Sequence, residues 1–351
     1  MTISDNPGPR VSSWQPHSRT IGMLKSVLFC QSSRKGAPMD PLSGVLSLLR
    51  IRNYHSAALK LGGDWAFDFP SRAGIKFTAV VKGSCWVKVS GEPTPQRLQQ
   101  GDCFLMTRGV PFTLSSDLGL PAMDSEGLFQ TPAPDEITLD YGGDDVQLVG
   151  GRFDFSGVPT QFLLSALPSL VHVQGNSPQA SILRWALERF TAELQQQRPG
   201  RSLMNEHLAH IMLVEVLRAH LAALEPSSLA SEGMGWFFGL ADRNLSVALS
   251  ALHANPARRW TVEELARLAA MSRSAFALRF KQIVGAAPME YLTHWRMLLA
   301  GDRLRNSGDS VASIAFSLGY ESESAFSTAF KRVMSHSPRQ YQREQAAAVE
   351  A

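Results

Sequence analysis

The sequence predicts an α+β fold of two domains, a β-rich N-terminal domain with appended helices and an all-α C-terminal domain. Three observations support this prediction. Apolar and polar residues alternate with a period of two over about 53–155. Over 261–332 the apolar residues recur at helical spacing instead. Within that helical part, one helix-turn-helix pattern is present twice, and such an internal repeat constrains a fold strongly.

The beginning of the chain differs in composition from the rest. Residues 1–38 are rich in Ser, Pro and Gln, which predicts a disordered extension. A regular pattern begins at Met39, where Pro41 at the start and Leu42, Val45 and Leu49 on one face predict a short helix. The chain has no run of about eighteen apolar residues, so no membrane-spanning helix is expected.

Short strands separated by Gly and Pro follow this helix. The stretch FTAVVKGSCWVKVSG (77–91) alternates on both sides of a glycine turn, and GDCFLMTRGVPFTLSS (101–116) alternates after its Gly-Asp start. Two more strand-like runs cover 137–141 and 146–155. Many short strands of this kind predict a β-sandwich or a small barrel.

Three apolar stretches with helical spacing come next, at 162–170, 181–195 and 203–224. The last one is apolar over a broad side, which is wide for an isolated surface helix. We expect this side to pack in a core, and a homodimer interface is the second interpretation. The stretch EPSSLASEGMG (225–235) contains Pro, Ser and Gly without periodicity and predicts an interdomain linker.

The charge is divided unevenly along the chain. The net charge is +3, and the part from Ala241 to the C-terminus carries +4 against −1 for the part before it. This small basic excess excludes a bare polycation and permits a domain that recognises nucleic acid. The predicted domains are a disordered extension at 1–38, a sensor domain at 39–224, a linker and lead-in at 225–243, a helical domain at 244–345 and a tail at 346–351.

The two copies of the helix-turn-helix pattern run over 261–282 and 310–332. Residues before the turn return forty-nine positions later and residues after it return fifty positions later, because the second turn has one extra residue. The matching pairs are Val262 and Val311, Leu265 and Ile314, Ala266 and Ala315, Ser272 and Ser322, Ala275 and Ala325, Phe276 and Phe326, Phe280 and Phe330, Lys281 and Lys331, Pro288 and Pro338, and Tyr291 and Tyr341.

Each copy has the residues that a helix-turn-helix requires. Thr261 and Ser310 suit the start of the first helix, because their side-chain oxygens accept from unpaired amides, and a serine also precedes each second helix. Gly319 suits the second turn, where the backbone can adopt a positive φ. The two phenylalanines of each second helix are expected to face the core. Ordinary helical hairpins share single features of this pattern, but two copies in register favour a fold that inserts helices into DNA grooves.

Residues from about Asn244 to Arg343 resemble the DNA-binding domain of the AraC/XylS transcription regulators. The resemblance is carried by the first motif, by APMEYLTHWRMLLA (287–300), by GYESESAFSTAFKR (319–332) and by SPRQY (337–341). It implies seven helices, with helix-turn-helix motifs at about 262–283 and 311–333 and a rigid connecting helix after Pro288. It also implies recognition helices ~34 Å apart in successive major grooves of double-stranded DNA, and RNA polymerase as a partner.

By position, the resemblance assigns base-facing roles to Arg273, Ser274, Ala277 and Leu278 in the first recognition helix and to Glu323, Ser324, Ser327 and Thr328 in the second. Many relatives have Arg at the positions of Leu278 and Thr328, and Arg binds guanine through two hydrogen bonds. Leu278 suits a thymine methyl and Thr328 suits several base edges or a phosphate, so we expect a different sequence preference. Phosphate contacts are expected from Lys281, Arg296, Lys331 and Arg332, with solvated surface charge as the alternative.

The N-terminal strands resemble a second module. GSCWVKVSG followed by LQQGDCFLMTRGVPF is similar to the cupin-like sensor domain that often precedes this DNA-binding domain, over roughly 40–155. The resemblance implies a cytoplasmic transcription regulator, activator or repressor, that responds to an unknown small-molecule effector. A cupin-type metal enzyme and a constitutive DNA-binding protein without effector are the alternatives.

The metal-enzyme alternative requires ligands that the sequence lacks. Catalytic cupins bind a metal through a His-x-His pair and a Glu on the first motif and another His on the second. Here the first motif has no His, Phe112 stands where the second-motif His is expected, and His55 is isolated. His207 and His210 share a helix face, but their helix is expected to be a packing element. We expect no catalytic residue, no metal, no cofactor and no enzyme activity.

The three cysteines, Cys30, Cys85 and Cys103, are too few for a disulfide framework and agree with a reducing cytoplasm. Cys85 and Cys103 fall in strand-like stretches, so we expect small core residues, with a thiol switch as the alternative. Many relatives have Cys at the position of Gly150, and its absence here speaks against the thiol switch.

Overall fold

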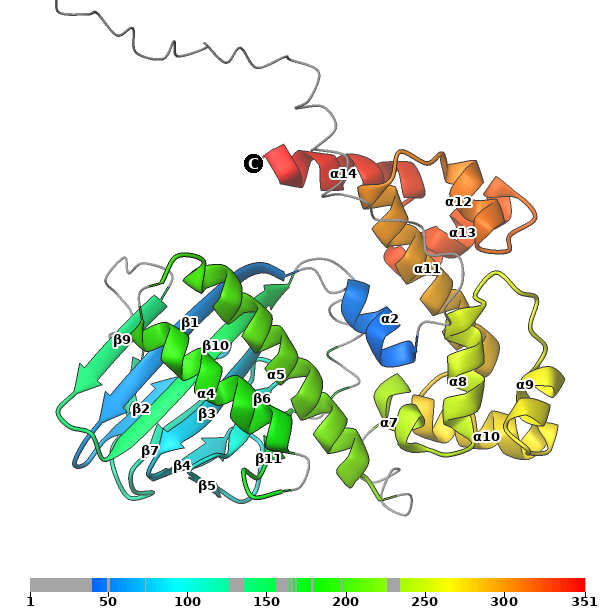
Figure 1. The fold of residues 1–351 in the computed structure, drawn as a ribbon. Coiled ribbons are helices and arrows are strands. Elements are labelled where there is room, and N and C mark those ends of the chain that lie inside the picture. The colour runs from blue at the N-terminus through cyan, green and yellow to red at the C-terminus, as the bar shows by residue number, and fades with distance from the viewer. Residues whose placement is uncertain are drawn as a thin grey trace, which may run out of the picture. The chain divides into compact units, whose positions relative to one another are not determined.

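The computed structural model describes residues 40–350, apart from 49–50, 73, 126–135, 156–163, 165–166, 168, 178–179, 197 and 226–233. The expected disordered extension at 1–38 and most of the expected linker lie outside the described residues. Over the described part, the predicted α+β fold is confirmed, with a β-rich N-terminal domain followed by helices (Figure 1). Within the same residues, no helix is both long and apolar enough to cross a membrane.

The N-terminal domain is built on two β-sheets. The larger has the strand order β11-β6-β3-β10-β1-β9, and the smaller has the order β5-β4-β7-β2-β8. The strands are β1 (Ile51–Leu61), β2 (Ala66–Phe69), β3 (Ile75–Lys82), β4 (Ser84–Val89), β5 (Gln96–Gln99), β6 (Cys103–Met106), β7 (Phe112–Ser115), β8 (Met123–Asp124), β9 (Glu136–Tyr141), β10 (Val146–Phe155) and β11 (Leu170–Val173). Strand β10 lies in the middle of the larger sheet, where it pairs antiparallel with β3 on one side and along its length with β1 on the other, and β9 is added in parallel to β1 at the edge.

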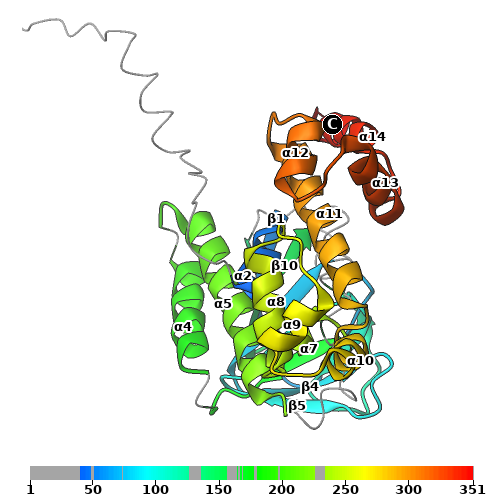
Figure 2. The same cartoon turned by 90° about the vertical axis from the view of Figure 1, so that its right-hand side faces the viewer.

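Side chains of β3 point alternately to the two faces of the larger sheet and contribute to a separate apolar core on each face. Phe77 is buried with the helices on the outer face of the larger sheet, and its ring lies 5.8 Å from that of Phe190. Val80 is buried on the opposite face, with apolar side chains of both sheets. The covering helices are α4 (Ser181–Gln195) and α5 (Arg201–Ala223), which lie side by side over the larger sheet in Figures 1 and 2.

The expectation of a helix at 162–170 is wrong at its C-terminal end. Leu170 is the first residue of β11 and pairs with Met106 of β6. Val171 and Val173 are buried and alternate with half-buried neighbours, which is typical of a strand. A short apolar run does not distinguish a strand from a helix, and only the pairing with β6 decides the outcome here. Most of the remaining stretch lies outside the described residues.

The C-terminal part is helical throughout its described residues. The connecting helix α11 runs from the first helix-turn-helix to the second, as Figure 1 shows in orange. We call α7 to α10 with the start of α11 the first half, and the end of α11 with α12 to α14 the second half. The helices are α7 (Trp236–Ala241), α8 (Leu245–Ala254), α9 (Val262–Leu268), α10 (Arg273–Val284), α11 (Pro288–Asn306), α12 (Val311–Ser317), α13 (Glu323–Met334) and α14 (Pro338–Glu350).

The short helix α2 (Pro41–Leu48) begins at the predicted proline and contacts the first half. Val45 and Leu48 are buried in the same cluster as residues of α8 and α11. A Cβ atom on Gly44 would lie 3.5 Å from His253 and from Trp295. These are ordinary van der Waals distances, so α2 packs directly against both rings without requiring glycine at this position.

Candidate nucleic-acid interface

The first helix-turn-helix has the predicted caps at the start of both helices. The Thr261 hydroxyl accepts from the Glu264 amide at 3.2 Å, and the Glu264 carboxylate accepts from the Thr261 amide at 2.9 Å. This reciprocal pair is a capping box, which satisfies two amides that a helix start leaves unpaired. The hydroxyl of Ser272 accepts from the Ala275 amide at 3.3 Å and begins α10 in the same way.

The second helix-turn-helix repeats these features. Ser310 accepts from the Ser313 amide at 3.1 Å, and Ser322 accepts from the Ala325 amide at 3.2 Å. The two turns share a backbone conformation, because Ala270 has φ of 52° and Gly319 has φ of 83°. The repeat in the sequence is therefore a repeat in the structure.

The phenylalanines of both recognition helices are buried, as predicted. Phe276 and Phe280 lie 5.5 Å apart between ring centroids, and their counterparts in α13 lie 5.7 Å apart. Tyr291 packs edge-on against Phe280 at 5.8 Å, and Tyr341 packs edge-on against Phe330 at 5.5 Å. The duplicated Pro-x-x-Tyr sequence thus places an equivalent tyrosine beneath each recognition helix.

A buried carboxylate that the sequence analysis missed fixes α10 to α8. Asp242 has 1% of its side chain exposed, and one of its oxygens accepts from Arg279 of α10 at 2.6 Å. Its other oxygen accepts from the amides of Asn244 and Leu245, each at 2.9 Å. An aspartate that accepts from the amide two residues further on forms an Asx turn, which is a recognisable local pattern. Its partner Arg279, thirty-seven residues away, leaves no local sequence signal.

The side chains predicted to face bases lie on the outer sides of α10 and α13. Leu278 is 61% exposed, so its isobutyl group is available on the outer face of α10. The residues with exposed surface are Arg273, Ser274, Leu278, Ser324 and Thr328, and those with partly exposed surface are Ala277, Glu323 and Ser327. The outer face of α13 therefore carries small and polar side chains, whereas that of α10 also carries the apolar Leu278.

Four of these side chains already have partners, among them Ser274, whose hydroxyl oxygen lies 3.5 Å from that of Ser272. Arg273 forms an ion pair of 2.9 Å with Glu263 of α9, and Glu323 lies 3.9 Å from Arg339. The Thr328 hydroxyl donates to the Ser324 carbonyl at 3.0 Å. The hydroxyl hydrogen of Thr328 is thereby occupied, while its oxygen and its methyl group stay on the outer face.

The four residues predicted to contact phosphate are not alike. Lys281, Lys331 and Arg332 are exposed in the last turns of the recognition helices. Arg296 is half-buried on α11 and donates to the carbonyls of Pro256 and Arg258, at 2.6 and 3.0 Å. The structure thus assigns Arg296 two backbone partners within the protein.

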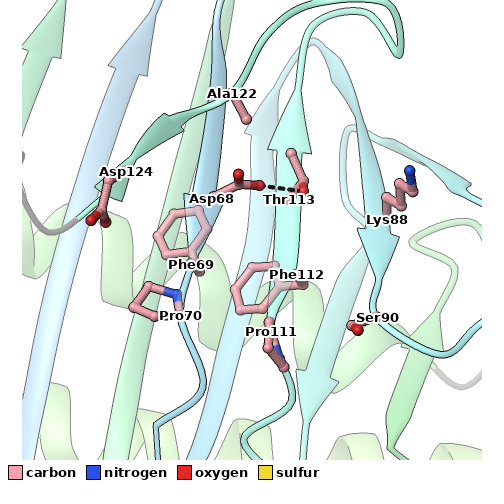
Figure 3. Close-up of a pocket in the computed structure, with 10 residues that line it drawn as sticks. All are labelled: Asp68, Phe69, Pro70, Lys88, Ser90, Pro111, Phe112, Thr113, Ala122 and Asp124. Carbon is pink, nitrogen blue, oxygen red and sulfur yellow. Dashed lines mark hydrogen bonds between the residues drawn. The ribbon is translucent and has the colours of Figure 1, made fainter.

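A cavity of about 610 Å³ lies on the smaller sheet of the N-terminal domain, at the end of β2 and β7. Figure 3 shows the rings of Phe69 and Phe112 beside each other in its wall, with Asp68 accepting a hydrogen bond from Thr113. The two ring centroids are 4.7 Å apart. The cavity is lined by Asp68, Phe69, Pro70, Lys88, Ser90, Pro111, Phe112, Thr113, Ala122 and Asp124.

A lysine lies against the same aromatic pair. The Lys76 Nζ atom is 3.5 Å from the ring centroid of Phe69 and 4.7 Å from that of Phe112. Burial, together with the nearby charges of Arg152 and Arg72, lowers the pKa of Lys76 to about 7. The amine is therefore held by aromatic faces in a position where its charge is easily lost.

The cysteines of the N-terminal domain are buried thiols. Burial raises the pKa of Cys85 and of Cys103 to about 12, and the charge of Asp102 acts in the same direction. A thiol with so high a pKa is a poor nucleophile at neutral pH. In the described part of the chain, no three His, Cys, Asp or Glu side chains lie close enough together to hold a metal ion.

Comparison with known proteins matches both domains. Residues 40–222 match the family described as Cupin, and residues 265–344 match a family described as a helix-turn-helix domain. An AraC-like transcription regulator of Streptomyces antibioticus is 46% identical over 305 residues, which cover 87% of this chain and 99% of that protein. The HTH-type transcriptional regulator AlkR of Acinetobacter baylyi is 33% identical, covering 87% of this chain and 100% of AlkR.

Solved structures also match. The DNA-binding domain of AdpA, in complex with a target DNA, is 34% identical over 30% of this chain and 96% of that domain, with a TM-score of 0.29. Fatty-acid-bound ToxT from Vibrio cholerae is 12% identical over 82% of this chain and 94% of ToxT, with a TM-score of 0.32. The full-length match to the curated regulators, with a cupin domain before a duplicated helix-turn-helix, shows that this chain belongs to the AraC family of transcription regulators.

Proposed function

We propose that this chain binds specific double-stranded DNA sites with α10 and α13 in successive major grooves. The observation that supports it best is the duplicated geometry. Each half has a capped recognition helix, a phenylalanine core beneath it and an outer face of small or polar side chains, to which α10 adds the exposed Leu278. A single such helix would suit many functions, whereas two equivalent ones suit two consecutive groove contacts.

In this proposal the two kinds of surface residue have different roles. Leu278 contacts a thymine methyl group, and the Thr328 oxygen accepts from an exocyclic amino group of a base. Further base contacts come from Arg273, Ser274, Ala277, Glu323, Ser324 and Ser327. The exposed cations Lys281, Lys331 and Arg332 bind phosphates and position the helices without distinguishing sequences.

Selection from a random pool of duplex DNA tests this function. The full-length protein should enrich sites with two half-sites separated by about one helical turn, 10–10.5 base pairs. Ser327→Glu should abolish the enrichment of one half-site, because a carboxylate on the outer face of α13 repels phosphate. Gln195→Glu, in an exposed position of α4, is the matched control. Failure to enrich any paired half-sites would sink the proposal.

We further propose that the cavity beside Phe69 and Phe112 receives a small-molecule effector. Its volume of about 610 Å³ falls within the ~300–1,000 Å³ typical of small-molecule sites. Its apolar wall and its few charged groups, including Asp68 and Lys88, suit a compact ligand with an apolar body and polar substituents. A constitutive regulator has no need of such a site.

Filling the cavity tests the effector hypothesis. Ser90 is exposed and lines the cavity, so Ser90→Trp should occupy it without disturbing the core. In a reporter strain, this variant should lose the response to the inducing compound while the purified protein keeps its DNA affinity. Gln195→Trp controls for an added surface tryptophan. An unchanged response in Ser90→Trp would exclude this cavity as the effector site.

A homodimer is proposed from the outer side of α4 and α5. Large apolar side chains are exposed there, namely Ile182, Trp185, Leu203, Met204 and Ile211. Exposed apolar surface of this kind on two neighbouring helices is typical of an interface. Trp185→Glu should convert a dimer to a monomer in analytical ultracentrifugation, and a wild-type protein that is monomeric at micromolar concentration would rule the interface out.

The remaining assignments follow from the regulator function. We propose the domain boundaries given by the sequence, RNA polymerase as the partner at the promoter, the cytoplasm as the place of action, and no enzyme activity or cofactor. The relatives named above are transcription regulators, which supports these assignments. Metal analysis of the purified protein separates this proposal from a cupin-type metal enzyme, since a stoichiometric transition metal would favour the enzyme.

A further inference from the structure

The two halves of the DNA-binding domain touch at a second place besides the connecting helix. The loop 255–260, between α8 and α9 of the first half, contacts the turn of the second helix-turn-helix. At this contact a Cβ atom on Gly319 would lie 2.1 Å from the carbonyl oxygen of Ala257. That distance is far shorter than any van der Waals contact, so the approach requires glycine.

The comparison of the two turns shows that this glycine serves the contact and not the turn alone. Ala270 occupies the same position in the first copy, also with a positive φ, and its side chain is exposed. A non-glycine residue is therefore tolerated where the turn faces solvent. Gly319 stands in the one copy whose turn is covered by the loop of the other half.

Arg296 connects three segments, namely the helix α11, the loop 255–260 and the turn of the second helix-turn-helix. It extends from α11 and donates to the carbonyls of Pro256 and Arg258, at 2.6 and 3.0 Å. Its guanidinium carbon lies 5.7 Å from the ring centroid of Tyr320, which follows Gly319 in the second turn. One planar side chain thus fixes the loop of the first half and the turn of the second to the connecting helix.

A further ion pair crosses the same contact, between Arg259 of the loop and Glu321 of the turn. Both side chains are 75% exposed, so this pair adds little stability by itself. Its position does show that the loop and the turn match in charge as well as in shape. We call this contact the interhalf junction. It consists of residues 256–259 of the loop, Arg296 of α11, and Gly319, Tyr320 and Glu321 of the turn.

We propose that Arg296 and Gly319 are positioning residues that set the separation and rotation between α10 and α13, and so determine which half-site spacing the protein accepts. This inference rests on the proposed binding in two successive grooves. A helix alone can bend and twist along its length. A second contact beside it removes that freedom and holds α13 at one distance and one rotation relative to α10.

The consequence for binding is a narrow tolerance for spacing. When the first helix is bound, a rigid arrangement gives the second helix a high effective concentration at the correct spacing and almost none at others. A loosened junction lowers the effective concentration at the correct spacing and raises it at other spacings. Affinity for an isolated half-site does not depend on the junction.

A spacing series measures this directly. Duplexes containing the selected bipartite site are made with one, two or five base pairs inserted between the half-sites, together with a duplex that has one half-site only. Each inserted base pair turns one half-site by about 35° relative to the other. Wild-type full-length protein should lose about tenfold in affinity with one inserted base pair.

Three variants should flatten this profile. Arg296→Ala, Arg296→Lys and Gly319→Ala should each bind the optimal site about tenfold more weakly than wild type and lose less than about threefold on insertion of one base pair. Their affinity for the half-site duplex should stay within about twofold of wild type. Arg296→Lys also separates the junction from a phosphate contact, because lysine keeps the charge but cannot bond both carbonyls while stacking on Tyr320.

Arg303→Ala is the matched control. Arg303 also extends from α11, but it bonds Ser317 and Asp309, both within the second half. Its loss should leave the steep dependence on spacing intact. A wild-type profile in Arg296→Lys and Gly319→Ala would overturn the inference. Absence of bipartite binding by the wild type would instead overturn the proposed function, so the two failures are distinguishable.

Discussion

The Nε2 atom of His253 lies 2.7 Å from the hydroxyl oxygen of Tyr291, inside the core of the first half. The His253 ring also stacks on Trp295, with centroids 4.1 Å apart. Burial lowers the pKa of His253 to about 3, from an ordinary value of 6.5. The imidazole is therefore neutral in the folded protein throughout the physiological range.

This burial predicts a loss of stability in acid. Between pH 6.5 and about 3 the unfolded chain binds a proton at His253 that the folded chain does not bind. The free energy of unfolding should therefore fall as the pH drops below 6.5, with this residue contributing up to about 1.4 kcal/mol per pH unit. Urea unfolding at pH 7.5, 6.5 and 5.5 measures the slope. His253→Gln should reduce the slope, and an unchanged slope in that variant would contradict the assignment.

The buried carboxylate of Asp242 predicts a strongly destabilising substitution. Asp242→Ala removes the partner of Arg279 and leaves the amides of Asn244 and Leu245 without an acceptor. The loss should be about 2–4 kcal/mol in the free energy of unfolding, because a buried ion pair and two hydrogen bonds to backbone amides are lost together. Thermal and urea unfolding of the full chain measure it.

Arg273→Ala is the control for that experiment. Its ion pair with Glu263 is exposed, with 70% and 50% of the two side chains accessible. Exposed pairs contribute less than about 1 kcal/mol, so stability should change little. If both variants proved equally stable, the structural role assigned to Asp242 would be wrong.

The features that could be predicted from the sequence are those formed by neighbours along the chain. The caps at Thr261 and Ser322 and the buried phenylalanines follow from local spacing, and a repeat doubles the signal. Contacts between distant segments could not be predicted. Nothing in the sequence indicates that Arg296 bonds carbonyls about forty residues away, because a carbonyl is present at every residue. Strand β11 was missed for the same reason, since its partner β6 lies far away in the sequence.

Thr328 and Lys331 should differ in their effects on DNA binding. Lys331→Ala should weaken binding to all sequences alike and reduce the salt slope by about one, because one phosphate contact is lost. Thr328→Arg should change the preferred base at one position, because Arg bonds guanine in two places. Selection from a random DNA pool measures both effects. An identical consensus for Thr328→Arg and the wild type would show that Thr328 does not face bases.

The buried thiols predict slow chemistry with thiol reagents. In a Cys30→Ser background, Cys85 and Cys103 should not react with a disulfide reagent such as dithionitrobenzoate at pH 7 until the protein unfolds, because both pKa values are raised to about 12. Absorbance of the released thiol in native buffer and in guanidinium measures this. Rapid native reaction of either cysteine would reopen the hypothesis of a thiol switch.

The helical part should bind DNA without the N-terminal domain. A fragment of residues 231–351 contains both helix-turn-helix motifs and the interhalf junction, so its groove contacts are complete. The fragment lacks α2, whose Gly44 packs beside His253 and Trp295. Addition of a peptide of residues 39–50 should therefore raise the melting temperature of the fragment. With ~6–10 phosphate contacts, the affinity of the fragment should fall ~10³–10⁵-fold between ~50 and ~200 mM salt. Fluorescence anisotropy with the selected duplex measures this, and a folded fragment whose binding is absent or insensitive to salt would contradict the groove-binding arrangement.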